Sequence, residues 1–208
     1  MDAIHFYFQF VSAMKESNVF EKTGQTYFEI YRDFKAFTEL VNKYVIHNII
    51  ENDPSGLTVQ HEYYRIDTVG WKSNYKDIVD DASDAGLNPH LWDLEVAIEH
   101  ENDVCDWTDE VIKLIHIKCP LKVIICYNHH DIRNENDLEK LSFVADCMNK
   151  VKAFHYGDEE YLLIIGNASN SITHKASYNC FDYRGYVLDS RDMKFSRLSV
   201  KPLFMHRK

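Results

Sequence analysis

The spacing of apolar residues predicts a helical N-terminal part. Residues 1–17 predict the first turns of a buried helix rather than an export signal, because an acid follows Met1 and polar residues interrupt the apolar stretch. Residues 26–50 repeat apolar side chains every three or four positions, as one face of a helix does. The segment ENDPSG at 51–56 supplies turn chemistry and ends this part.

Strand patterns follow this break. Residues 57–71 are rich in β-branched and aromatic side chains, which favours a strand or a hairpin. Residues 92–103, WDLEVAIEHEND, alternate apolar and acidic positions, as a half-buried strand does. Two continuous apolar runs, 121–127 and 160–167, are typical of strands covered on both faces. A hairpin is expected over 178–190, with its turn at Arg184–Gly185.

Helical patterns alternate with these strands. They are expected over 106–118 with Asp106 as N-cap, over 136–154, and briefly over 75–86, ending at Gly86. We therefore expect one domain, 1–208, of the α/β class, with a mixed central sheet flanked by helices, an N-terminal helical segment and a C-terminal β-hairpin. It divides into a helical part (1–55), a candidate catalytic core (57–127), and a helix, strand, hairpin and tail (128–208).

The composition of the chain limits its expected cellular compartment and binding partners. No run reaches the roughly 20 apolar residues that span a bilayer, so no membrane association is expected. The five cysteines include no C-x-x-C pair, which indicates a reduced, cytoplasmic protein without a thiolate zinc site. The net charge of −10 is unusual for a nucleic-acid-binding protein. However, residues 191–208 contain six Lys or Arg against one Asp.

Carboxylates gather at the end of the strand 92–103. Alternate residues of a strand share a face, so Glu99 and Glu101 are expected on the side opposite Leu94, Val96 and Ile98. Carboxylate oxygens at this spacing suit Mg²⁺ or Mn²⁺. Asp67 lies within the strand pattern of 57–71, although Asp is depleted from strands. These acids form a candidate site if the two strands are neighbours.

The order of these features resembles the PD-(D/E)XK nuclease superfamily, which has the restriction-endonuclease-like fold. The matching segments span residues 25 to 127 and are "RID" with Asp67, "AIEHE" with Glu99 and Glu101, the helix "WTDEVIKLIHI" and the strand "LKVIICY". Two positions depart from the motif: Ile66 replaces its proline, and Glu101 replaces its lysine. A lysine displaced onto the following helix, Lys113, is the candidate substitute.

The resemblance implies a Mg²⁺- or Mn²⁺-dependent endonuclease or phosphodiesterase acting on nucleic acid, DNA in preference to RNA, in defence or DNA processing. Asp67, Glu99 and the backbone carbonyl of His100 would hold the metal. Glu101, or Lys113 by reach, would position or deprotonate the attacking water. The His100 side chain is expected to face the core. Such enzymes often act as dimers, so a homodimer is left open.

Two other functions stay open. The chain could be a non-enzymatic immunity or inhibitor protein on the same fold, whose acidic face binds a basic protein partner; the missing motif lysine fits this reading. It could also hydrolyse another phosphate ester with a metal. The simplest alternative is that the acids are solvated and only block edge-to-edge strand pairing.

Some further residues carry weaker signals. His129, His130 and Asp131 follow an apolar strand but lack the spacing of a zinc site, so a solvated loop is expected. Glu29 and Glu39 are expected at the surface, and Cys126 in the core. The basic tail either contacts phosphates or docks on the acidic body, and contains Lys194, Phe195, Arg197, Lys201, Phe204, Arg207 and Lys208.

Overall fold

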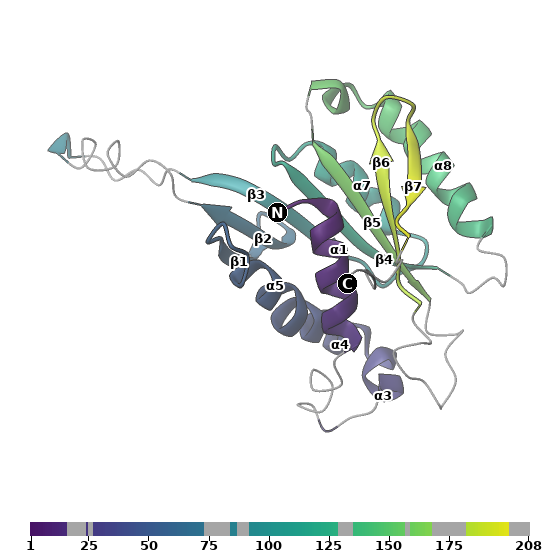
Figure 1. Ribbon diagram of the computed structural model, residues 1–208, viewed down its shortest axis with the longest axis horizontal. Helices are drawn as coiled ribbons and strands as arrows, with labels where there is room; N and C mark the ends of the chain where they lie inside the picture. Colours follow the sequence, from purple (N-terminus) through teal and green to yellow (C-terminus); the bar gives the residue numbers. More distant parts are fainter. Residues whose placement is uncertain are drawn as a thin grey trace, which may run out of the picture.

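A seven-stranded mixed sheet forms the centre of the protein (Figure 1). The computed structural model describes residues 1–15, 24, 27–72, 84–86, 92–128, 135–156, 159–167 and 182–199. The strands lie in chain order and are β1 (Thr58–Tyr63), β2 (Ile66–Lys72), β3 (Asp93–His100), β4 (Leu121–Asn128), β5 (Glu160–Asn167), β6 (Arg184–Asp189) and β7 (Lys194–Arg197). β3, β4 and β5 run parallel, and the other neighbouring pairs are antiparallel.

Helices cover both faces of this sheet (Figure 1). One face carries α1 (Ala3–Lys15), α4 (Phe34–Leu40), the π-helix η1 (Val41–Ile46) and α5 (His47–Glu51), with α3 (Tyr27–Arg32) preceding α4. The other face carries α7 (Trp107–Ile115), α8 (Glu135–Lys150) and the 3₁₀-helix η2 (Lys152–Tyr156). The predicted α/β class, mixed sheet, N-terminal helical segment and C-terminal hairpin are therefore confirmed. Among the described helices, none is both long and apolar enough to cross a bilayer.

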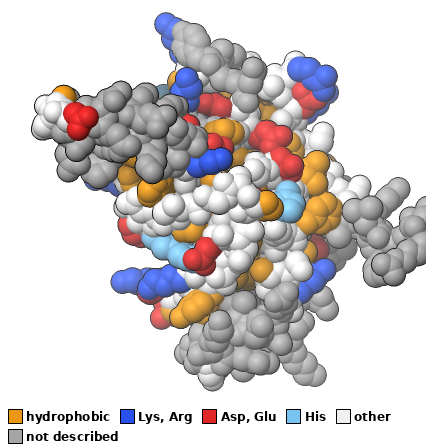
Figure 2. Space-filling view, turned by 60° about the vertical axis from the view of Figure 1, so that its left-hand side comes forward, with side chains coloured by type: hydrophobic (Ala, Val, Ile, Leu, Met, Phe, Trp, Pro, Cys, Tyr) orange, Lys and Arg blue, Asp and Glu red, His pale blue; other side chains and the backbone are white. Residues whose placement is uncertain are grey.

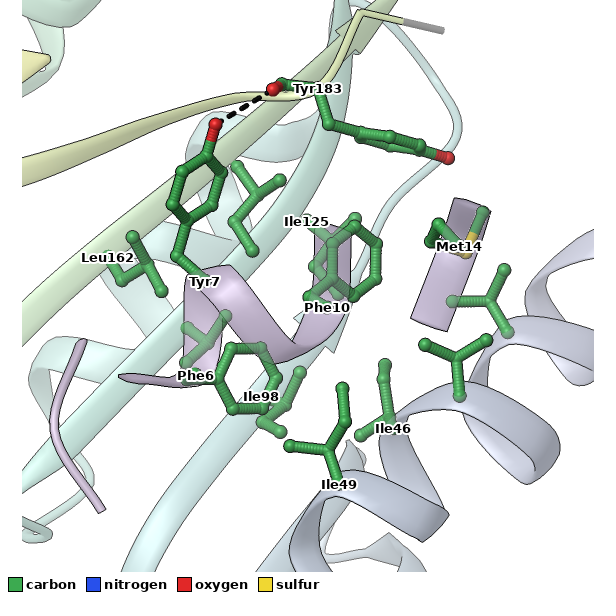
Figure 3. Packing of buried hydrophobic residues seen from close by; sticks show 14 of the residues in the cluster. Phe6, Tyr7, Phe10, Met14, Ile46, Ile49, Ile98, Ile125, Leu162 and Tyr183 are labelled. Carbon is green, nitrogen blue, oxygen red and sulfur yellow. Dashed lines mark hydrogen bonds between the residues drawn. The ribbon is translucent and has the colours of Figure 1, made fainter. Parts of the chain in front are cut away.

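Aromatic and aliphatic side chains fix α1 to the sheet (Figure 3). Phe6, Phe10 and Met14 are fully buried against β-strand residues and the helix α5. The Tyr7 hydroxyl donates a hydrogen bond to the Tyr183 carbonyl at 2.9 Å, which ties α1 to the start of β6. Each such buried side chain contributes roughly 2 kcal/mol of transfer free energy. The N-terminal helix predicted from the first residues is confirmed in both position and burial.

The strand β4 is buried along its whole length, as its apolar sequence predicted. Its one charged residue, Lys122, is fully buried and donates hydrogen bonds to Glu159 at 2.9 Å and to the Tyr161 hydroxyl at 3.0 Å. A buried ammonium needs such partners, because an unpaired charge is expensive away from water. Cys126 is also fully buried, and burial raises the pKa of its thiol, so it acts as a core side chain.

The C-terminal hairpin turns later than predicted. Arg184 and Gly185 lie within β6, and the turn falls at residues 190–193, so the predicted turn position is wrong. Gly185 does not form a turn but allows the Tyr7 ring to pack closely on the backbone of β6, because a Cβ there would lie 2.7 Å from the ring. The second strand, β7, contains Lys194, Phe195 and Arg197, and Phe195 packs on the core.

The segment 57–71 forms two strands with a tight turn between them. Tyr64 and Arg65, at the turn, have positive φ values of 46° and 67°. Such two-residue connections match the twist of the flanking strands. Of the short helix predicted over 75–86, only residues 84–86 are described, and Gly86 has the positive φ expected at a helix end.

Candidate active site

The two carboxylates singled out in the sequence meet on neighbouring strands. Thr68 of β2 pairs with Ile98 of β3, so the next residues, Asp67 and Glu99, face each other at the end of this strand pair. The His100 amide donates to Asp67 Oδ2 at 2.8 Å, and the Asp67 amide donates to Glu99 Oε2 at 3.4 Å. The backbone of each strand therefore holds the carboxylate of the other.

Lys113 of α7 completes this group. Its Nζ lies 2.7 Å from Glu99 Oε1 and donates to the Arg65 carbonyl at 2.9 Å. It also forms an ion pair with Glu110, one turn earlier on α7. The helix can deliver Lys113 to β3 because Trp107, Leu114 and Ile115 anchor its opposite face in the core. The structure thus brings together Asp67, Glu99 and Lys113.

Burial raises the pKa values of both carboxyl groups. Burial, followed by the charge of Asp67, raises the pKa of Glu99 to about 8 despite the nearby ammonium. Burial likewise raises the pKa of Asp67, partly offset by the His100 amide and by Lys113. Burial lowers the pKa of Lys113, but the carboxylates of Glu110 and Glu99 together raise it by more, so the net shift of the pKa is upward. Lys113 is therefore a cation at neutral pH.

Glu101 and His100 occupy different positions from these three residues. β3 ends at His100, so Glu101 follows the strand, where its carboxylate accepts the Asp103 amide at 2.7 Å. The His100 side chain turns to the opposite face and lies 3.0 Å from the Tyr127 hydroxyl through Nε2. It is 5% exposed, and burial lowers its pKa to about 3, so it is a neutral core residue.

A cleft of about 670 Å³ opens beside Asp67. Asp67, His100 and Glu101 lie on one side of it, and the helical segment α4–η1 forms the other wall. A larger cleft of about 870 Å³ lies on the α7 face and is lined by Tyr63, Trp92 and neighbouring residues, but it does not include Asp67. The smaller cleft therefore reaches the candidate site at Asp67, whereas Glu99 and Lys113 do not line it.

The donor set fits a hard divalent cation. In the described part of the chain no three His, Cys, Asp or Glu side chains form a ready-made metal cluster. Mg²⁺, however, binds through one or two carboxylates, with water and substrate phosphate as further ligands. Asp67 and Glu99 supply that pair, and Lys113 Nζ, 2.7 Å from Glu99 Oε1, lies beside it. A cation between the two carboxylates would relieve their repulsion.

Glu110 was missed in the sequence. Its ion pair with Lys113 follows from their i, i+3 spacing on a helix, a signal that was available. Glu39 is exposed and pairs with Lys43 at the wall of the cleft, and Glu29 is exposed on α3, as expected. The candidates His129, His130 and Asp131, and the tail residues Lys201, Phe204, Arg207 and Lys208, lie outside the described residues.

Comparison of the chain with protein-family models, curated proteins and solved structures gives no significant match. The geometry of Asp67, Glu99 and Lys113 therefore carries the functional argument by itself.

Figure 2 shows one side of the molecule, where acidic, basic and histidine side chains are interspersed with apolar ones. Acidic groups do not dominate the described surface on this side. The charge of −10 is thus not gathered into one continuous acidic area in this view.

Proposed function

We propose that this protein is a Mg²⁺- or Mn²⁺-dependent nuclease that hydrolyses phosphodiester bonds, with DNA as its main substrate. One observation carries the proposal: Asp67, Glu99 and Lys113 come from three different elements and meet at one site, with Lys113 Nζ 2.7 Å from Glu99 Oε1. Buried, mutually repelling carboxylates are costly for a fold, and groups with such raised pKa values are typical of functional sites.

The order of elements supports the same proposal. The resemblance to the PD-(D/E)XK superfamily implies a strand with Asp, a strand with Glu-x-Lys or Glu-x-Glu, a helix and an apolar strand. β2, β3, α7 and β4 follow in that order, with β2 and β3 antiparallel and β3 and β4 parallel. The restriction-endonuclease-like fold is therefore part of the proposal.

The chain's own residues divide the work as follows. A Mg²⁺ ion held by Asp67 and Glu99 would supply Lewis-acid polarisation of a phosphoryl oxygen and a lower pKa for water. Lys113, held as a cation by Glu110 and Glu99, orients the attacking water and stabilises negative charge on the phosphate. A protonated lysine cannot accept a proton, so Glu101, at the edge of the cleft, is the candidate base.

One argument for a non-enzymatic binding protein was that the lysine of the nuclease motif is missing from this chain. Lys113 offers an ammonium group at Glu99 in its place. This contact favours the enzyme over the acidic immunity-type protein.

Asp67→Asn tests the proposed function. We expect the wild-type protein to cleave a fluorescent DNA oligonucleotide with Mg²⁺ or Mn²⁺ but not with EDTA. Asp67→Asn should reduce the rate roughly a thousandfold, because it removes one of two charged ligands. Cleavage that persists in EDTA, or that survives the substitution in a folded variant, would rule out a metal-dependent site at Asp67.

Lys113→Met tests whether Lys113 acts in catalysis without contributing to metal binding. We expect kcat/KM to fall by about 10²- to 10³-fold, because the charge that stabilises the transition state is lost. Calorimetric binding of Mn²⁺ should remain, since both carboxylates stay in place. Lys118→Met is the matched control, because Lys118 is exposed just beyond the same helix and should keep wild-type activity. Wild-type kinetics for Lys113→Met would remove Lys113 from the mechanism.

A further inference from the structure

Three polar atoms of the cleft beside Asp67 lack partners. Asn42 Oδ1, His100 Nδ1 and Asn102 Oδ1 are buried and have no hydrogen-bond partner among the described residues, and all three residues line this one cleft. Leaving a buried polar atom unpaired is costly, so most such atoms in folded proteins have a partner. Their clustering indicates that a molecule with hydrogen-bonding edges occupies the cleft, directly or through water.

The orientation of Asn102 is set by its amide nitrogen. Nδ2 donates to the Phe34 carbonyl at 3.1 Å and to the Thr38 hydroxyl, so the remaining oxygen is the acceptor left without a partner. Asn42 lies on η1, is 9% exposed and also retains an unpaired oxygen. The two amide oxygens can accept hydrogen bonds from the amino group of a nucleobase, and the imidazole nitrogen offers a third polar contact to its edge.

The charge of the cleft selects a base over a phosphate. Glu39, Glu62, Glu101 and Asp103 line it together with Asp67, so acids outnumber its two lysines. Such surroundings repel a phosphate that no cation compensates, yet they accept a neutral base.

An aromatic ring lies at the same cleft. Phe34, the first residue of α4, is 48% exposed although its ring is large and apolar. Exposed aromatic rings that line such clefts serve as stacking platforms for unpaired bases. A cleft of about 670 Å³ is large enough for a nucleotide. A base within a duplex is stacked on its neighbours, so only an unpaired or flipped-out base can stack on this ring.

We propose that this cleft binds one unpaired nucleobase next to the scissile phosphate, so that the substrate is single-stranded DNA or a duplex with unpaired nucleotides. The base stacks on Phe34 and its edge faces Asn42, Asn102 and His100. This inference rests on the proposed nuclease function, because Asp67, which lines the same cleft, would place the phosphate through the metal.

The test measures binding separately from cleavage. A fluorescent 12-nucleotide DNA strand and the same sequence as a blunt duplex are titrated with the protein in Ca²⁺, and anisotropy gives the two affinities. We expect the single strand to bind at least about tenfold more tightly. Phe34→Ala should weaken its binding about tenfold. Asn42→Ala should weaken it about fivefold. Asn48→Ala, an exposed Asn outside the cleft, should leave it unchanged.

The outcomes separate the two proposals. Equal affinity for both DNAs, or wild-type binding by both cleft variants, overturns the nucleobase site even if the enzyme cleaves DNA. Because Phe34 is exposed, its variant should fold even if Asn42→Ala does not, and thermal unfolding checks both. Cleft-dependent single-strand binding without any cleavage in Mn²⁺ supports the base site and contradicts the nuclease.

Discussion

Replacing Glu99 by Gln is expected to make the metal-free protein more stable at alkaline pH while it abolishes cleavage. Glu99 is 2% exposed and faces Asp67, so its charged form is buried beside a like charge. Gln keeps the shape of the side chain and removes the charge. Lys113 loses one partner but retains Glu110 and the Arg65 carbonyl. If replacing Glu99 stabilises the fold, the residue is retained for function and not for stability.

The pH dependence follows from the direction of the shift. The pKa of Glu99 is raised from an ordinary 4.5 to about 8 in the folded protein. A raised value means that the folded state favours the protonated acid, so its stabilising contribution is complete below pH 4.5 and is lost as the pH rises to about 8. Glu99→Gln should therefore match the wild type near pH 4.5 and exceed it by roughly 2–4 kcal/mol at pH 9.

Urea unfolding in EDTA at pH 5 and pH 9 measures this difference. Glu101→Gln is the matched control for stability, because it removes a carboxylate of the same cleft that lies outside the buried pair. We expect its unfolding midpoint to stay close to the wild-type value at both pH values. A Glu99→Gln variant less stable than wild type at pH 9 would mean that the pair with Lys113 stabilises the fold and that the carboxylates are structural.

Asp137→Asn is expected to cause the largest loss of stability. Asp137 and Arg184 are each 2% exposed, and the carboxylate accepts from Arg184 Nε at 2.5 Å. Asp137 also accepts from the Tyr186 hydroxyl at 3.0 Å and from Asn128 Nδ2 at 2.8 Å. Asn cannot accept from all these donors, and it leaves the buried guanidinium with the half-exposed carboxylate of Asp182, at 3.3 Å, as its counter-charge. We expect a loss of about 3–5 kcal/mol in the free energy of unfolding.

A second substitution tests the cause. Asp137→Asn/Arg184→Met removes both charges, so the double variant should lose much less than the sum of the two single losses. Asp189→Asn is the control, because Asp189 pairs with Arg191, which is 87% exposed, and water replaces that contact. Its unfolding curve should overlay the wild type's. Equal effects of the buried and exposed substitutions would contradict this account.

The sequence predicted the candidate site better than the edges of the fold. Asp67 and Glu99 could be connected because strand order and spacing constrain which residues face each other, and Lys113 because α7 follows β3 directly. The contact between Lys113 and Glu99 depends on how α7 is tilted over the sheet, and the local sequence pattern does not determine this tilt. Arg184 and Gly185 misled for a similar reason: Arg-Gly suits a turn, but Asp137 and Tyr7, both distant in sequence, hold these residues in a strand.

The buried network around Arg184 also escaped prediction. Asn128 and Asn167 each end a buried strand, and parallel pairing places them side by side. Arg184 Nη1 donates to Asn167 Oδ1 at 2.9 Å, while Asn128 bonds Asp137. Polar residues at strand ends are ordinarily solvated, so only the packing of α8 and β6 over these ends shows that they are buried.

Calorimetric titration with Mn²⁺ tests the central claim most directly. At pH 8 the wild-type protein should bind Mn²⁺ at the site formed by Asp67 and Glu99, and Glu99→Gln should show no heat of binding at that site while remaining folded. Lys113→Met should still bind the ion. A wild-type protein that binds no Mn²⁺, or a Glu99→Gln variant that binds it as the wild type does, would contradict the claim that these carboxylates form a metal-dependent active site.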